Sequence, residues 1–153
     1  MPLSATMYHE DLDTWDAGGH VGTFRGNAPA MVGGIRAIEY IQDHDLLTHA
    51  QELGEYIRDR LEETIESTNQ IKNIRGRGLF IGVEFTDSEE TTGKEVVKAI
   101  QTECYEQGIL VWTAGRHGNV LRLIPPLVLT KEQAENGLDI ICTAIRNQTA
   151  DRV

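Results

Sequence analysis

IRGRGLFIGVEF, residues 74–85, is the stretch that decides the fold. Its second half alternates between two kinds of side chain: one set is Leu79, Ile81, Val83 and Phe85, and the other is Phe80, Gly82 and Glu84. Successive side chains of a strand point to opposite faces, so this pattern predicts a strand with one apolar face over a core. We therefore predict strands over residues 71–78 and 79–85.

Helical patterns precede these strands. Over residues 45–67, apolar side chains recur every three or four positions, and acidic side chains lie mostly off that stripe. This spacing predicts an amphipathic helix with a solvated acidic face. A shorter helix is predicted over residues 28–41, where Pro29 suits the first turn. Residues 1–27 are predicted to be mostly irregular.

Strands and helices also follow the central stretch. A helix is predicted over residues 93–107, ended by Gly108, and then short strands over 109–112 and 120–124. The sequence TKEQ at residues 130–133 is a capping box that begins a last helix. We expect that helix to run to about Arg146 and the tail from residue 148 to fray.

The order of these elements predicts the fold class. From residue 71 it is strand, strand, helix, strand, strand, helix, which indicates an α+β fold. We predict a mainly antiparallel sheet of three or four strands, with two helices covering one face. A long helix and an N-terminal loop segment precede it, and the natural division lies near residue 45, between units 1–45 and 46–153.

The charge balance excludes two classes of partner. The chain has 24 Asp and Glu residues against 14 Lys and Arg, a formal net charge of −10. Nucleic acid and anionic membrane surfaces both require a basic face, so neither is expected as a partner. No apolar run is long enough to cross a bilayer, and residues 1–7 lack the features of a secretory signal. We interpret the chain as cytoplasmic.

The few lysines suggest adaptation to salt. Only Lys72, Lys94, Lys98 and Lys131 are present, and a carboxylate excess with few lysines is typical of surfaces solvated at high salt. A halophilic source is one hypothesis, and an acidic mesophilic protein is the other. The halophilic hypothesis predicts a melting temperature that rises from low to molar salt. Equal melting temperatures at both salt concentrations would contradict it.

The cysteines and histidines indicate no metal chemistry. Cys104 and Cys142 belong to no CxxC motif, and both fall on the apolar side of helical patterns. We predict two buried free thiols. His44 and His49 are five residues apart, no HExxH motif is present, and no metal site is predicted.

The glycine-rich stretch GHVGTFRGNAP, residues 19–29, has two interpretations. Glycines allow close approach to a ligand, and a hydroxyl and an arginine are typical phosphate-binding groups, so the stretch is a candidate anion-binding loop before a helix. The alternative is a glycine-rich turn that only starts the helix. Neither a Walker loop nor a dinucleotide fingerprint is present.

Three motifs together resemble a known family. GTFRGNAP at 22–29 resembles the HTFGGNP-type motif of class III aminotransferases, which are fold type I enzymes. IRGRGLFIGVEF at 74–85 resembles their R-G-x-G-L-x-x-G-x-E segment, and VLRLIPPL at 120–127 resembles L-R-x-x-P-P-L. The motifs occur in the family's order and cover nearly the whole chain. The GTFRGN variant is most similar to the diaminobutyrate–2-oxoglutarate aminotransferases.

The resemblance implies roles for named residues. The cofactor would be pyridoxal 5′-phosphate, and the first motif, with Gly22 and Thr23, would bind its phosphate across the interface of a homodimer. Arg122 would pair with a substrate carboxylate; an arginine at a strand end is otherwise most often a surface residue. The substrates would be an amino acid, diaminobutyrate or a related diamine, and a keto acid such as 2-oxoglutarate.

The resemblance also implies that part of the enzyme lies outside this chain. Such an enzyme requires a lysine that holds the cofactor as a Schiff base, and the family carries it upstream of the glycine motif. PLSA at residues 2–5 resembles the segment just after that lysine, and all four lysines lie beyond residue 71. We therefore expect a C-terminal portion, a large-domain remnant followed by the small domain, that has no catalytic residue of its own and is inactive alone. It would require an N-terminal partner fragment or belong to a truncated, split or frame-shifted gene. The alternative is a free-standing binding or interaction module built from the small domain.

Overall fold

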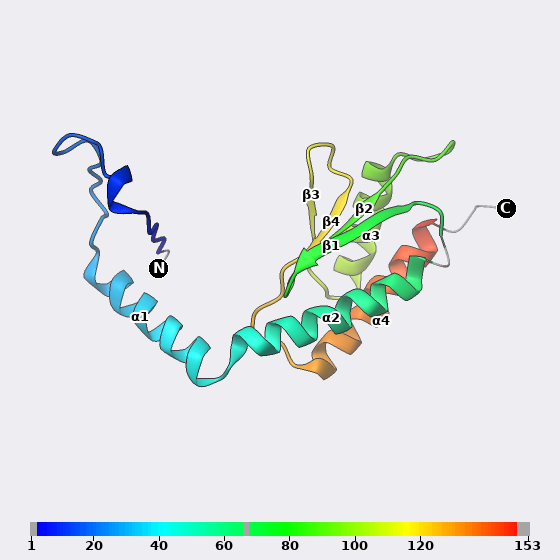
Figure 1. Ribbon diagram of the computed structural model, residues 1–153. Helices are drawn as coiled ribbons and strands as arrows, with labels where there is room; N and C mark the ends of the chain where they lie inside the picture. Colours follow the sequence, from blue (N-terminus) through cyan, green and yellow to red (C-terminus); the bar gives the residue numbers. More distant parts are fainter. Residues whose placement is uncertain (1–2, 66–67, 150–153) are drawn as a thin grey trace. The chain divides into compact units, whose positions relative to one another are not determined.

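The computed structural model describes residues 3–65 and 68–149, and it divides the chain into two compact units, Met1–Asp45 and Leu46–Val153 (Figure 1). Each unit is described by itself. None of the helices in the described ranges is long and apolar enough to span a membrane.

Unit 1 consists of an extended N-terminal segment and one long helix. A short 3₁₀ helix, η1, covers Glu10–Leu12, and α1 covers Ala28–Asp43. The Asn27 side chain accepts a hydrogen bond of 3.1 Å from the Ala30 N–H and so caps α1, as its position before the helix allows. Ala30 is the only described residue of α1 that is buried. The predicted apolar face is therefore present in the sequence but is not covered within this unit.

The sheet of unit 2 has four antiparallel strands in the order β1-β2-β4-β3. The strands are β1 (Ile71–Arg77), β2 (Phe80–Phe85), β3 (Trp112–Ala114) and β4 (Val120–Leu123). The predicted alternation is confirmed, because Ile81, Val83 and Phe85 are almost fully buried while Phe80 is 60% exposed. One face of the sheet therefore lies over the core, and we call the other the open face.

Three helices complete unit 2: α2 (Leu46–Ile65), α3 (Gly93–Glu106) and α4 (Lys131–Thr149). The helix α2 packs against β1 and β2, α3 packs against β2, β3 and β4, and α4 lies against both α2 and α3 (Figure 1). The predicted stripe of α2 is buried from Leu46 to Leu61. The predicted end of this helix, residues 66–67, lies outside the described residues.

Both cysteines are confirmed as buried free thiols. Burial among apolar side chains raises the pKa of the Cys104 thiol to about 11, and the nearby Glu103 carboxylate adds to the shift. The thiolate form of Cys104 is therefore suppressed at neutral pH.

The third strand differs from its prediction. A strand was expected over 109–112, but β3 covers Trp112–Ala114. The Ile109 N–H donates to the Cys104 carbonyl at 2.8 Å, which continues the end of α3, and the Gln101 side chain donates to the Val111 carbonyl at 2.8 Å. These contacts engage the backbone at both positions, so pairing with β4 begins only at Trp112.

The last helix begins as predicted and runs further. Thr130 and Gln133 form the expected reciprocal capping bonds of 3.0 and 3.2 Å. The helix continues to Thr149, past the predicted end at Arg146, because Gln148 donates to Glu103 of α3 at 2.8 Å and Thr149 is buried. The rest of the tail that was predicted to fray, residues 150–153, lies outside the described residues.

Candidate carboxylate site on the open face of the sheet

Arg122 lies near the middle of the open face. The β2–β4 register places it opposite Gly82, and the β3–β4 register places it opposite Trp112. Residues paired in register share one face of a sheet, so both neighbours are on the open face with Arg122. Gly82 has no side chain, and the neighbouring Val120 side chain lies over it, with Cγ1 3.1 Å from where a Cβ atom of residue 82 would be.

The guanidinium of Arg122 is available for a ligand. Its Nε atom is buried and has no hydrogen-bond partner, although nearly all buried polar groups in proteins have one. No ion pair among the described residues includes Arg122. A buried guanidinium nitrogen without a partner is costly, and a carboxylate that accepts its N–H would relieve that cost.

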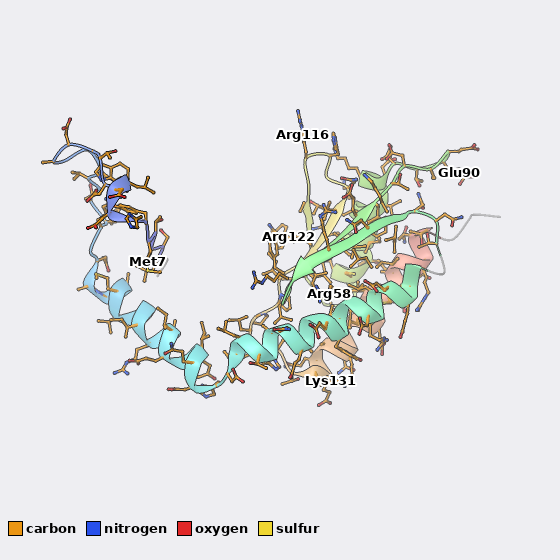
Figure 2. The ribbon with its side chains drawn as sticks, in the orientation of Figure 1. Met7, Arg58, Glu90, Arg116, Arg122 and Lys131 are labelled. Carbon is orange, nitrogen blue, oxygen red and sulfur yellow. The ribbon has the colours of Figure 1, made fainter. Side chains whose placement is uncertain are left out.

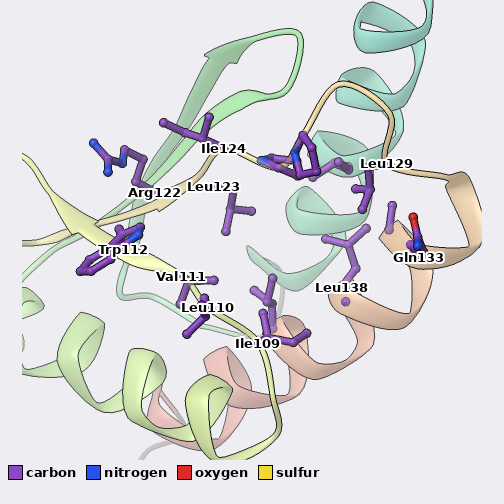
Figure 3. Close-up of a pocket in the computed structure, with 16 residues that line it drawn as sticks. Ile109, Leu110, Val111, Trp112, Arg122, Leu123, Ile124, Leu129, Gln133 and Leu138 are labelled. Atoms are coloured by element: carbon purple, nitrogen blue, oxygen red, sulfur yellow. The ribbon is translucent and has the colours of Figure 1, made fainter. Parts of the chain in front are cut away.

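A pocket of about 360 Å³ lies beside Arg122 and is lined by residues 109–112, residues 122–126 and side chains of α2 and α4. Trp112 and Arg122 lie at one end of it, and Leu129 and Gln133 lie at the other (Figure 3). Its walls are mainly apolar, and the volume is in the range of small-molecule pockets. One cation in apolar surroundings can hold a ligand that has a carboxylate at one end and carbon chain beyond it.

The open face also holds a second charge cluster, formed by Lys72, Glu84 and Arg75. Lys72 Nζ lies 3.0 Å from one Glu84 carboxylate oxygen, and the Arg75 guanidinium lies 2.5 Å from the other. Hydrogen bonds from Lys72 and then Arg75 hold the pKa of Glu84 below its ordinary value. Glu84 is therefore an ionised carboxylate whose two oxygens are both engaged.

The glycine loop of unit 1 is an exposed turn that leads into α1. The Arg25 N–H donates to the Gly22 carbonyl at 3.1 Å, and Gly26 has φ +65°, which favours glycine. The Arg25 guanidinium contacts the backbone carbonyl and imidazole of His20. The Arg25 side chain therefore joins the two ends of the turn at His20 and Arg25.

Gly22 and Thr23, the predicted phosphate-binding residues, lie within this turn. Thr23 is exposed, and its hydroxyl has no hydrogen-bond partner among the residues that the structure describes. A free hydroxyl on a glycine turn fits one edge of a phosphate group. Thr23 and Arg122 belong to different units, and each is described within its own unit.

Two features of the open face were missed by sequence reasoning. The alternation of residues 79–85 puts Glu84 on the open face, but its pairing with Lys72 depends on a register irregularity between Ile71 and Asn73. The position of Trp112 beside Arg122 was missed because β3 was predicted too early. Both features depend on cross-strand register, which no local pattern specifies.

The comparisons with known proteins agree with the family resemblance of the three motifs at residues 22–29, 74–85 and 120–127. The class III aminotransferase family model matches residues 1–145. The diaminobutyrate–2-oxoglutarate aminotransferase of Rhizobium meliloti is 40% identical over 143 residues, which cover 88% of this chain and 30% of that protein. The alanine/serine racemase of Pyrococcus horikoshii is 35% identical over 153 residues, which cover the whole chain and 32% of that protein.

A solved structure agrees with the fold. The acetylornithine aminotransferase of Elizabethkingia anophelis superposes with a TM-score of 0.74 at 32% identity, covering 88% of this chain and 34% of that one. The α+β unit with its open-faced sheet is therefore an aminotransferase-type domain. The chain belongs to the class III aminotransferases, the pyridoxal-phosphate-dependent family that its motifs resemble. It spans about a third of the length of the relatives it matches.

Proposed function

We propose that this chain is the C-terminal part of a pyridoxal-phosphate-dependent transaminase. In the whole enzyme the reaction would transfer an amino group from diaminobutyrate, or a related ω-amino acid or diamine, to 2-oxoglutarate. The buried, unpartnered Nε of Arg122 beside the apolar pocket is the observation that carries this proposal. The names of several similar proteins support the choice of diaminobutyrate and 2-oxoglutarate.

Arg122 would bind and orient a substrate carboxylate. A guanidinium donates two parallel hydrogen bonds to a carboxylate, which holds the substrate in one orientation. Trp112 and Ile124, which line the same pocket, would provide apolar contacts for the rest of the ligand. Such positioning lets binding energy support the reaction at the other end of the substrate.

Thr23 would supply one contact to the cofactor phosphate, with Gly22 allowing the close approach. Pyridoxal phosphate, when bound, supplies the electron sink for chemistry at the substrate amine. The lysine that the chemistry requires would come from an N-terminal part of the enzyme, because residues 1–45 contain none. We infer that this chain does not transfer amino groups by itself.

The surface of α1 supports a role for unit 1 as a remnant of the large domain. Met31, Ile35 and Ile38 recur at helical spacing on one face of α1 and are between 50% and 59% exposed, and an apolar face of this kind is typical of a helix that is covered by other elements. The N-terminal part of the enzyme would cover this face of α1. The whole enzyme would be a homodimer in which Thr23 reaches the cofactor site of the neighbouring subunit. A cytoplasmic location is part of the same proposal.

The binding role of Arg122 predicts a specific loss. In calorimetric titrations of the full chain with 2-oxoglutarate, Arg122→Ala is expected to weaken binding by about tenfold or more, the effect of removing a charge-assisted hydrogen-bonded pair. The same change is expected to abolish glutamate formation when the chain is mixed with the N-terminal part of the Rhizobium meliloti relative, pyridoxal phosphate, diaminobutyrate and 2-oxoglutarate.

Arg116→Ala is the matched control. Arg116 is exposed in the turn between β3 and β4, at the other end of the hairpin from Arg122 (Figure 2). Its removal makes the net charge more negative by the same single unit and is expected to leave binding within about twofold. Failure of the unmodified chain to bind 2-oxoglutarate, or equal losses in both variants, would contradict the proposed role.

A further inference from the structure

Glu84 lies on the open face within reach of Arg122. The β2–β4 register pairs Glu84 with Val120 and Gly82 with Arg122, so Glu84 and Arg122 are diagonal neighbours on one face. Diagonal neighbours in an antiparallel pair are about 7–8 Å apart, a span that long side chains cross. Gly82, directly opposite Arg122, has no side chain of its own, and the Val120 side chain lies over it. An ion pair between these two residues is therefore the default expectation for this face.

That ion pair is not made among the described residues. Each Glu84 oxygen is instead engaged by a different cation of β1, one by Lys72 at 3.0 Å and the other by Arg75 at 2.5 Å. Arg75 lies opposite Gly82 on the β1 side, and Lys72 occupies the irregularity between Ile71 and Asn73. A local irregularity in a strand re-aims a side chain, and here the Lys72 side chain reaches Glu84. The Glu84 side chain is only 19% exposed, so little of it is left to other partners.

We propose that Lys72 and Arg75 are positioning residues that hold Glu84 away from Arg122 and keep the Arg122 guanidinium open for a ligand carboxylate. The inference rests on the proposed role of Arg122. It assigns a purpose to the second sequence motif, in which Arg75 and Glu84 occur together: Arg75 engages a carboxylate that is a diagonal neighbour of Arg122.

The acidity of the chain as a whole gives a reason for such an arrangement. The chain carries a net charge of −10, and a ligand carboxylate must compete with the protein's own acids for any exposed cation. An intramolecular competitor has a high effective concentration because it does not have to diffuse to the site. A Glu84 free to turn would occupy Arg122 before a millimolar keto acid could.

The test compares the full chain with a Lys72→Met/Arg75→Met double variant, each labelled with ¹⁵N-arginine and titrated with 2-oxoglutarate. In the ligand-free double variant, the Arg122 Nε–H resonance is expected to shift as Glu84 becomes its partner. The dissociation constant for 2-oxoglutarate is expected to rise about fivefold, the effect of one competing surface ion pair. Adding Glu84→Gln to the double variant is expected to reverse both changes.

Several outcomes separate this inference from its alternatives. An unchanged Arg122 resonance in the ligand-free double variant overturns it, whether or not 2-oxoglutarate binds. Weaker binding that Glu84→Gln fails to rescue also overturns it, because loss of positive charge alone then accounts for the effect. If the double variant does not fold, Arg75→Met alone is used, since that side chain is half exposed and its removal frees one Glu84 oxygen. Absence of 2-oxoglutarate binding by the unmodified chain defeats the proposed function, and the ligand-free resonance still decides the Glu84 contact.

Discussion

Phe85→Ala is expected to lower the free energy of unfolding of this chain by about 3–5 kcal/mol. Phe85 ends β2 on the core face, is fully buried, and belongs to the core cluster formed by the sheet and the helices of unit 2. Truncation removes apolar contact and leaves a cavity that the surrounding side chains fill only in part. Urea denaturation followed by circular dichroism measures the change.

Phe80→Ala is the matched control for that prediction. Phe80 begins the same strand on the open face and is 60% exposed, so its truncation is expected to cost less than about 1 kcal/mol. Both variants remove the same atoms from the same strand and differ only in the face affected. Equal losses in the two variants would contradict the assignment of a core face and an open face to β2.

Gly54→Ala is expected to destabilise the chain by about 1–3 kcal/mol, the usual cost of forcing extra atoms into a packed contact. Gly54 lies within α2, where it faces the turn between β1 and β2. A Cβ atom at this position would lie 2.2 Å from the Gly78 carbonyl oxygen and 2.5 Å from its carbonyl carbon. The obstacle is backbone, so the clash is relieved only by moving α2 away from the sheet.

Gly137→Ala provides the comparison in another helix of the same unit. A Cβ atom at Gly137, in α4, would lie 3.7 Å from Ile109 Cδ1, an ordinary contact. Alanine favours helix over glycine by about 1 kcal/mol, so this variant is expected to be as stable as the unmodified chain or more so. If Gly54→Ala proved equally neutral in thermal melts, the close packing of α2 against the β1–β2 turn would be wrong.

Local patterns in the sequence were sufficient for most elements of unit 2. The alternation of residues 79–85 and the stripe of α2 were predictable because a strand and a helix each repeat on their own short period. The capping box at Thr130 was predictable for the same reason, since its bonds join residues three apart. The errors lie where distant contacts intervene: Gln101 and Cys104 delay β3, and Glu103 holds the last turn of α4.

Some features of the candidate site were likewise predictable from the sequence, and others depend on distant contacts. Arg122 was identifiable by its motif, but its unpartnered Nε atom and the engagement of Glu84 depend on which strands pair and in which register. Register is a cross-strand property, so residues far apart in the chain become neighbours that no local spacing reveals.

The sequence by itself determined the α+β class, the family and the chemical character of the candidate site residues Thr23 and Arg122, because these depend on side-chain type and short-range periodicity. Only the tertiary structure decided that the Arg122 Nε atom has no partner while both oxygens of Glu84 are engaged. That choice depends on the packing of four antiparallel strands, which places two β1 cations on one carboxylate and a glycine beside the arginine.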